Sequence, residues 1–322
     1  MSIVSGISVI ICCYNSAKRL PETIKHLAKQ QVPDSIPWEV IVVDNASTDD
    51  TSITASLEWN KYENRTDTSF SIVKEKMSGL TNARICGIMK SQYSYCLFCD
   101  DDNWLEEDYV HTAYVGISSD PKIGVIGGHG MPVFETNPPV WFEEVEESYA
   151  VGPQAPQAGD VTKERGYVFG AGAIFRRSVI LDLLNSNSGF LLTDRTGSAV
   201  TSGGDEELCL NYVLRGYEIH YTNELKFRHF IAASKLTEQY HNQLKYSFIK
   251  SRIVLSLYRY KIQGKEDILN RNFLWLRELV YSLKNDLLKR PFSLTDFISS
   301  YTVALIKNYN SYHRTLNYLK QY

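Results

Sequence analysis

The sequence predicts an α/β protein with a doubly wound, mostly parallel sheet that is flanked by helices. Short apolar runs of strand character alternate along the chain with amphipathic segments of helical period. The first two apolar runs, residues 7–13 and 38–43, enclose one helical segment, and this spacing fits a right-handed βαβ unit with parallel strands. Both runs end in polar residues, which is where open α/β sheets place their ligands.

The amino-terminal part of the chain supplies five of the predicted strands. We expect Asn15 or Ser16 to cap a first helix that runs to about Gln31, before Pro33 ends it. A polar turn at residues 46–51 leads from the second strand into a second helix. Further strands are predicted at residues 70–73, 95–99 and 123–128, and further helices over residues 80–90 and 106–118.

The next part of the chain is less regular. Residues 135–166 contain several prolines and a cluster of glutamates, and so long a loop in a compact domain is usually a lid or a binding loop. A strand is predicted over residues 167–175, and a loop rich in Gly, Ser and Thr over residues 185–204. The chain continues with a predicted helix from Asp205 to Gly216, a strand at residues 218–221 and a wholly helical region beyond about residue 236.

Composition and apolar patterning predict a soluble protein of a reducing compartment. The 322 residues include 43% hydrophobic and 22% charged residues, as in ordinary globular proteins. We expect no signal peptide, and no apolar stretch reaches the roughly 18 residues that a membrane-spanning helix needs. Most of the six cysteines lie in apolar runs, which suits buried thiols. We therefore expect a cytoplasmic protein.

Charge is distributed unevenly along the chain. Residues 1–225 contain 17 Lys and Arg against 31 Asp and Glu, a formal charge of −14, whereas residues 226–322 contain 17 against 6, a formal charge of +11. The basic region includes amphipathic segments, which either lie peripherally on the inner face of an anionic membrane or pack their apolar faces on a core. Because the body of the protein is acidic, no nucleic acid is expected as a partner.

Three adjacent carboxylates at residues 100–102 follow the apolar run at 95–99. Their mutual repulsion favours a nearby cation, and carboxylate oxygens suit Mg²⁺ or Mn²⁺. Alternate residues of an extended strand end point to the same side, so Asp100 and Asp102 are candidates to share one metal ion. The alternative is a solvated acidic turn in which Asp102 or Asn103 caps a helix.

Four short segments, taken in order, resemble the motifs of one known family. They are residues 9–15, 42–49, 79–84 and 98–102, the last of which contains an Asp-x-Asp pattern. In this order they are similar to the motifs of the family 2 glycosyltransferases, which have the GT-A fold, and the resemblance extends over roughly residues 5–232. Cys12 and Cys13 stand where the family commonly has a Pro-Thr pair.

The resemblance implies a domain organisation and an activity. A GT-A domain would occupy residues 1–235, with a nucleotide-binding half at about 1–104 and an acceptor half at about 105–235, and residues 236–322 would form a helical carboxyl-terminal region. The implied reaction is an inverting transfer of a sugar from a nucleotide-diphosphate donor, expected to be a UDP-sugar, to an acceptor hydroxyl. The acceptor would be a carbohydrate or a lipid-linked glycan of bacterial-type polysaccharide synthesis.

The resemblance also implies roles for matched residues. Asp44 would accept the nucleobase N–H with Tyr14 beside the base, Arg84 would approach the diphosphate, and Asp100 would lie near the ribose. Asp102 would hold a divalent cation, Mn²⁺ or Mg²⁺, and a His at the position of His229 serves some members as a further ligand. The implied donor-binding residues are Tyr14, Asn15, Asp44, Arg84, Asp100 and Asp101.

Residues 203–207, Gly-Gly-Asp-Glu-Glu, depart from the family pattern. The family usually has a Glu-Asp pair in which the Asp is the general base, and here Gly204 replaces the Glu while Asp205 aligns with the base. One carboxylate is enough to remove a proton from an acceptor hydroxyl, so activity is expected to survive. Two alternatives remain: Asp205 is a helix cap, or the protein is a catalytically weakened scaffold that only binds nucleotide sugars.

Overall fold

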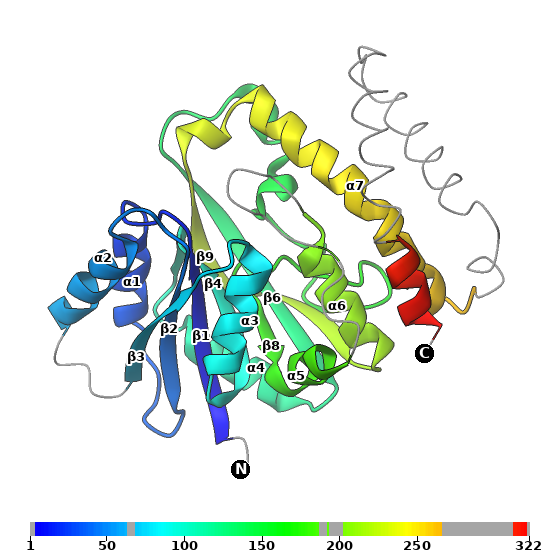
Figure 1. Ribbon diagram of the computed structural model, residues 1–322, viewed down its shortest axis with the longest axis horizontal. Coiled ribbons are helices and arrows are strands. Elements are labelled where there is room, and N and C mark those ends of the chain that lie inside the picture. The colour runs from blue at the N-terminus through cyan, green and yellow to red at the C-terminus, as the bar shows by residue number, and fades with distance from the viewer. Residues whose placement is uncertain (1–3, 63–67, 187–191, 193–201, 266–311, 321–322) are drawn as a thin grey trace.

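The computed structural model describes residues 4–62, 68–186, 192, 202–265 and 312–320. Within these residues one mixed sheet, in the strand order β3-β2-β1-β4-β8-β6-β9-β5, forms the centre of the molecule (Figure 1). The predicted α/β fold with a helix-flanked sheet is thereby confirmed.

The amino-terminal half of the sheet is parallel, as the βαβ spacing predicted. Strands β3, β2, β1 and β4 lie side by side in the same direction, so their carboxyl ends meet at one edge. This edge is formed by the ends of β1 (Val4–Cys13), β2 (Trp38–Asn45), β3 (Thr68–Glu75) and β4 (Tyr93–Asp100).

The second half of the sheet is joined through an antiparallel pair of β4 and β8. The pairs β6–β8, β5–β9 and β7–β9 are also antiparallel, whereas β6 and β9 are parallel. These strands are β5 (Asn103–Leu105), β6 (Ile123–Phe134), β7 (Gly159–Asp160), β8 (Ile174–Arg176) and β9 (Glu218–Ile231).

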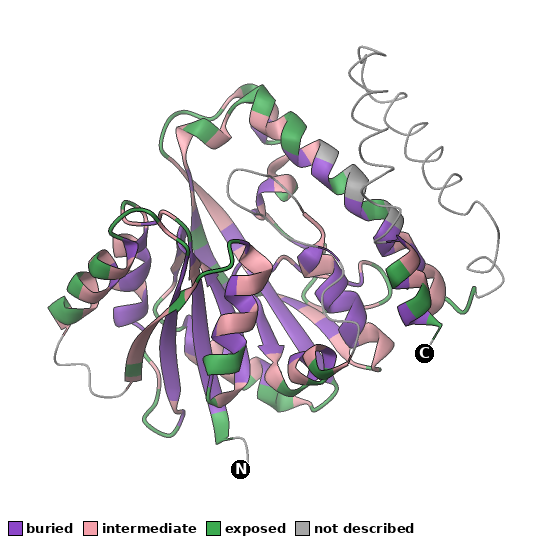
Figure 2. Ribbon diagram, viewed as in Figure 1, coloured by how far each residue is buried: buried purple, intermediate pink, exposed green. Residues whose placement is uncertain are grey.

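Helices cover both faces of the sheet and bury its alternating side chains (Figures 1 and 2). One face packs against α3 (Leu80–Lys90), α5 (Arg177–Asn185), α6 (Gly204–Leu214) and α7 (Glu238–Ile262). The other packs against α1 (Leu20–Ala28), α2 (Thr51–Trp59) and α4 (Tyr109–Ser119). Along β1 the alternation is direct, since Ile10 packs on the first face while Val9 and Ile11 pack on the second.

The predicted cap of the first helix is wrong. Helix α1 begins only at Leu20, and neither Asn15 nor Ser16 caps it, because both side chains have tertiary partners. Ser16 donates its hydroxyl to Asp101, and Asn15, with a left-handed φ of 49°, accepts a hydrogen bond from the Thr48 backbone. Contacts between distant loops therefore override the local preference of these two residues for capping a helix.

Two further local predictions differ from the structure. Of the predicted strand at 167–175, only Ile174 and Phe175 are in β8, because Gly172 has a φ of 71° and turns the chain away from extended structure. Neither Asp102 nor Asn103 caps a helix, since Asn103 starts β5 and pairs with His229 of β9.

Helix α7 packs its apolar face on the protein. Leu244, Val254, Leu255, Leu257 and Tyr258 are buried, the last four against α6 and the sheet. This is the core-packing alternative for the segment at 245–259, whereas the second basic amphipathic segment, at 271–284, lies outside the described residues. Among the described helices, none combines the length and the apolar character that crossing a membrane requires.

Glu207 of α6 joins α7 to the core. It is fully buried, and its carboxylate accepts hydrogen bonds from the Tyr258 hydroxyl at 2.9 Å and from the Leu192 backbone N–H at 2.8 Å. Hydrogen bonds to buried charges contribute about 1.5–3 kcal/mol each. The junction between α6 and α7 is therefore held in part by a buried carboxylate of α6 that accepts a hydrogen bond from α7.

We expect Tyr258→Phe to lower the free energy of unfolding by about 1.5–3 kcal/mol, because the Glu207 carboxylate would lose a donor inside the core. Urea denaturation followed by circular dichroism measures the change. Tyr14→Phe is the matched control, since Tyr14 is 41% exposed and its change should stay within about 0.5 kcal/mol. Equal effects of the two substitutions would contradict this role of Glu207.

Candidate active site

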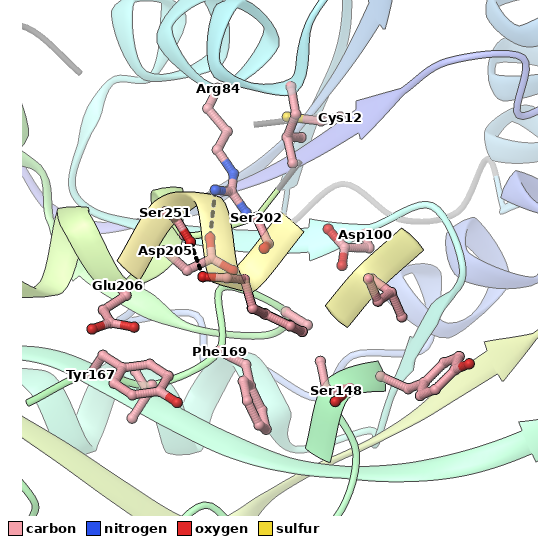
Figure 3. Close-up of a pocket in the computed structure, with 18 of the residues that line it drawn as sticks. Cys12, Arg84, Asp100, Ser148, Tyr167, Phe169, Ser202, Asp205, Glu206 and Ser251 are labelled. Carbon is pink, nitrogen blue, oxygen red and sulfur yellow. Dashed lines mark hydrogen bonds and ion pairs between the residues drawn. The ribbon is translucent and has the colours of Figure 1, made fainter. Parts of the chain in front are cut away.

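A cavity of about 980 Å³ opens at the carboxyl ends of β1 and β4 and is closed on its far side by α7. Figure 3 shows that side chains from distant parts of the chain point into it. Of the residues predicted from the sequence, seven line this cavity: Tyr14, Arg84, Asp100, Asp101, Asp102, Asp205 and His229. Two others, Asn15 and Asp44, are not among the described residues that line it.

Asp44 and Asn15 shape the loops beside the cavity. The Asp44 carboxylate is 7% exposed and accepts hydrogen bonds from the Ser47 backbone N–H at 3.2 Å and from the Ser52 hydroxyl. Asn15 receives the Thr48 backbone N–H at 2.8 Å. These bonds fix the turn after β2 against the turn after β1, beside the half-exposed ring of Tyr14.

The three carboxylates at the end of β4 point in different directions. Asp101 receives the Ser16 hydroxyl and the Arg19 guanidinium, the latter at 2.6 Å. Asp102 lies 2.8 Å from the Lys235 ammonium and 3.4 Å from the Nε2 atom of His229. The acidic cluster is therefore divided into one carboxylate that ties down the first loop and one that faces a basic group from the end of β9.

Electrostatics separates Asp100 from Asp102. Burial raises the pKa of Asp100, and the neighbouring Asp102 carboxylate raises it further. Burial alone would also raise the pKa of Asp102, but the Lys235 ammonium and His229 outweigh burial and hold it well below its usual value. Asp102 thus remains charged, and it does so because cations gather around it.

This arrangement fits a divalent cation for which the protein supplies only some of the ligands. Among the described residues, no three His, Cys, Asp or Glu side chains gather closely enough to hold a metal ion by themselves. Asp102 and His229 nevertheless converge, with 3.4 Å between Oδ1 and Nε2. Mg²⁺ and similar ions are often held by one or two protein ligands plus substrate phosphates, so a two-ligand site suits a metal that arrives with a diphosphate.

Asp205 does not cap α6 as the alternative reading of the sequence proposed. Gly203 is the cap residue, with a φ of 108°, and Asp205 lies in the first turn. Its carboxylate receives the Arg84 guanidinium at 2.6 Å (Figure 3). It also receives the Gly170 backbone N–H at 2.9 Å. A Cβ atom on Gly170 would lie 2.2 Å from the carboxylate, so only glycine permits this approach.

Arg84 is the partner of Asp205 from the opposite wall. It is 7% exposed, and its guanidinium also lies over the Phe98 ring, 4.8 Å from the ring centroid. The residue predicted to approach a diphosphate therefore lies in the same cavity as the predicted base and forms an ion pair with it.

Sequence reasoning missed the long-range partners of these residues. Lys235 contacts Asp102 from the 3₁₀ turn after β9, and Arg259 of α7 contacts Glu206 at 2.5 Å. No local motif marks either cation, and their positions follow only from how β9 and α7 fold back on the sheet. The predicted loop at 135–166 contributes Glu147, Ser148, Tyr149 and Ala150 to the lining of the cavity.

Comparison with known proteins points to one family. The family model described as glycosyl transferase family 2 matches residues 8–184. The poly(ribitol-phosphate) β-N-acetylglucosaminyltransferase TarS of Staphylococcus aureus is 27% identical over 218 residues, which are 64% of this chain and 37% of TarS. The poly-β-1,6-N-acetyl-D-glucosamine synthase of Staphylococcus epidermidis is 25% identical over 127 residues, 39% of this chain and 29% of the synthase. The chain thus spans well under half the length of these relatives.

Solved structures share the fold. Residues 1–349 of S. aureus TarS superimpose with a TM-score of 0.59 at 18% identity, covering 97% of this chain and 81% of that chain. A mannosyltransferase of Pyrobaculum calidifontis, solved with GDP-Man and Mn²⁺, gives a TM-score of 0.56 at 18% identity, covering 99% of this chain and 86% of that chain. At these identities the likeness concerns the fold.

Proposed function

Because the chain belongs to glycosyl transferase family 2, we propose that it transfers a sugar from a nucleotide-diphosphate donor, specifically a UDP-sugar, to an acceptor hydroxyl with inversion at the anomeric carbon. The observation that supports the proposal is a cavity that gathers Asp100 at the end of β4, Asp102 from the turn after it, Arg84 from α3 and Asp205 from α6. These groups are far apart in the sequence and meet only in the folded chain. Together they could stabilise the charge of a leaving diphosphate and remove a proton from an acceptor.

Asp205 acts as the general base in this proposal. It removes the proton of the acceptor hydroxyl while the oxygen attacks the anomeric carbon, and the bond to the diphosphate breaks on the opposite face. Arg84 and the Gly170 N–H orient the carboxylate. Arg84 would also supply positive charge to the departing diphosphate, as the family resemblance implies.

Asp102 and His229 would hold a divalent cation, Mn²⁺ or Mg²⁺, which would supply positive charge to the leaving diphosphate. Arg19 keeps Asp101 out of this role, so Asp101 positions the loop after β1. Asp44 and Tyr14 would receive the nucleobase, with Asn15 fixing the loop between them and Asp100 near the ribose.

We propose a carbohydrate or lipid-linked acceptor in bacterial-type polysaccharide synthesis. The two relatives differ in this respect, since one is named for a charged poly(ribitol-phosphate) and the other for an uncharged N-acetylglucosamine polymer. We also propose a cytoplasmic location with peripheral membrane contact through the basic region at 226–322. Co-sedimentation of the full chain with anionic vesicles, reversed by salt, would support that contact, and equal, negligible sedimentation with anionic and neutral vesicles would exclude it.

A thermal-shift experiment followed by a donor-hydrolysis assay tests the function. In Mn²⁺ we expect UDP and UDP-sugars to raise the melting temperature more than GDP does, since a ligand of the native state stabilises it. We also expect slow UDP release from a UDP-sugar. Binding without hydrolysis or transfer would favour the catalytically weakened scaffold, for which the replacement at Gly204 is the sequence argument. No shift with any nucleotide diphosphate would contradict the proposal.

A further inference from the structure

One face of α7 lies over the cavity and is basic. Lys245, Phe248, Arg252 and Arg259 all line the cavity, and their spacing of three to seven residues places them on the same side of the helix. The opposite, apolar side of α7 is buried against the core. The charged residues of this face therefore line the cavity on the side of α7 that is not packed on the core.

Most cations of the cavity are already neutralised by a carboxylate of the cavity. The pairs are Arg19–Asp101 at 2.6 Å, Arg84–Asp205 at 2.6 Å, Lys235–Asp102 at 2.8 Å and Arg259–Glu206 at 2.5 Å. Arg252 differs from these four. Its side chain is exposed and forms neither an ion pair nor a hydrogen bond with the part of the chain that the structure describes. Arg252 therefore adds a positive charge to the cavity that no carboxylate of the described residues neutralises.

The position of Arg252 relative to the base is fixed by the packing of α7. Arg259 contacts Glu206, the residue next to Asp205, and Arg252 lies seven residues earlier on α7. Seven residues of α-helix rise about 10 Å. Ser251 of α7 contacts Gly203, because a Cβ atom added to Gly203 would lie 2.5 Å from the Cβ atom of Ser251. This contact keeps α7 close to the start of α6. Arg252, which follows Ser251, thus lies close to the start of α6, where Asp205 also lies.

We propose that Lys245, Phe248 and Arg252 form an acceptor subsite that binds an anionic chain of the phosphodiester class. The inference rests on the proposed transferase function and names the acceptor class for that site. Two cations two helical turns apart fit a chain that carries charge on successive units, and guanidinium groups bind phosphate oxygens in bidentate fashion. Phe248, which is 43% exposed, offers an apolar face between them.

The test compares Arg252→Glu with Lys29→Glu in the full chain. Both substitutions reverse one exposed positive charge, but Lys29, at the end of α1, is not among the residues that line the cavity. The probes are soluble poly(ribitol phosphate) and an uncharged N-acetylglucosamine oligomer. We expect Arg252→Glu to raise KM for the phosphodiester chain at least tenfold, and Arg252→Lys to restore most of the loss, while UDP affinity and donor hydrolysis remain unchanged.

Direct binding of poly(ribitol phosphate) at rising ionic strength is the second measurement. A subsite built on charge predicts that salt weakens binding to the native chain more steeply than binding to Arg252→Glu. The inference is wrong if Arg252→Glu matches Lys29→Glu, or if the native chain uses the uncharged oligomer equally well at all salt concentrations. It is also wrong if Arg252→Glu abolishes only vesicle binding, since that result would assign Arg252 to a membrane. If the native chain itself shows no donor hydrolysis, the proposed function is contradicted instead.

Discussion

Asp205→Asn is expected to lower kcat by on the order of 10²-fold or more, while the affinity for the donor stays nearly unchanged. The amide has the shape of the carboxylate and keeps an oxygen for the Gly170 N–H, but it accepts no proton. Steady-state kinetics with a UDP-sugar and titration of UDP measure the two quantities separately. The melting temperature is measured alongside, because Arg84 is 7% exposed and would lose its charged partner.

Glu206→Gln is the matched control for the base. It removes a neighbouring carboxylate that is occupied by Arg259, so we expect at most a few-fold change in kcat. A large loss of donor affinity in Asp205→Asn would mean that Asp205 serves the nucleotide. If Glu206→Gln were the crippling substitution, the base would have been assigned one residue too early.

Asp102→Asn is expected to abolish transfer and to weaken UDP binding in Mn²⁺ while the fold is retained. The substitution removes the carboxylate that contacts both His229 and Lys235, so it removes the proposed charged metal ligand. Calorimetric titration of UDP with and without Mn²⁺ measures the coupling between metal and nucleotide.

Asp101→Asn separates the two roles within the acidic cluster. Asp101 binds Ser16 and Arg19, so its replacement should lower the melting temperature but preserve the dependence of UDP binding on Mn²⁺. If Asp102→Asn retains most of the activity, or if Asp101→Asn removes the metal dependence instead, the assignment of the metal to Asp102 is wrong.

The sequence predicted the sheet and the polar edge of the cavity because both follow from local patterns. An apolar run that ends in carboxylates defines a strand and its carboxyl end, and parallel strands then bring Cys13, Asn45 and Asp100 to one edge. The contact of Arg84 with Asp205 joins residues 121 positions apart, and no periodicity encodes it. The cap at Ser16 failed for the same reason, since a distant carboxylate competed for its hydroxyl.

The burial of Glu207 has a consequence for how the chain becomes active during its synthesis. The ribosome completes the sheet and α6 before it makes α7, and until then Glu207 lacks the Tyr258 hydroxyl. Without α7 the Glu207 carboxylate lacks one of its hydrogen-bond donors, so we expect α6 to be docked less firmly until residue 258 has emerged. Asp205 would then be aligned late. A ribosome-bound fragment would therefore bind a nucleotide sugar before it could transfer the sugar to an acceptor.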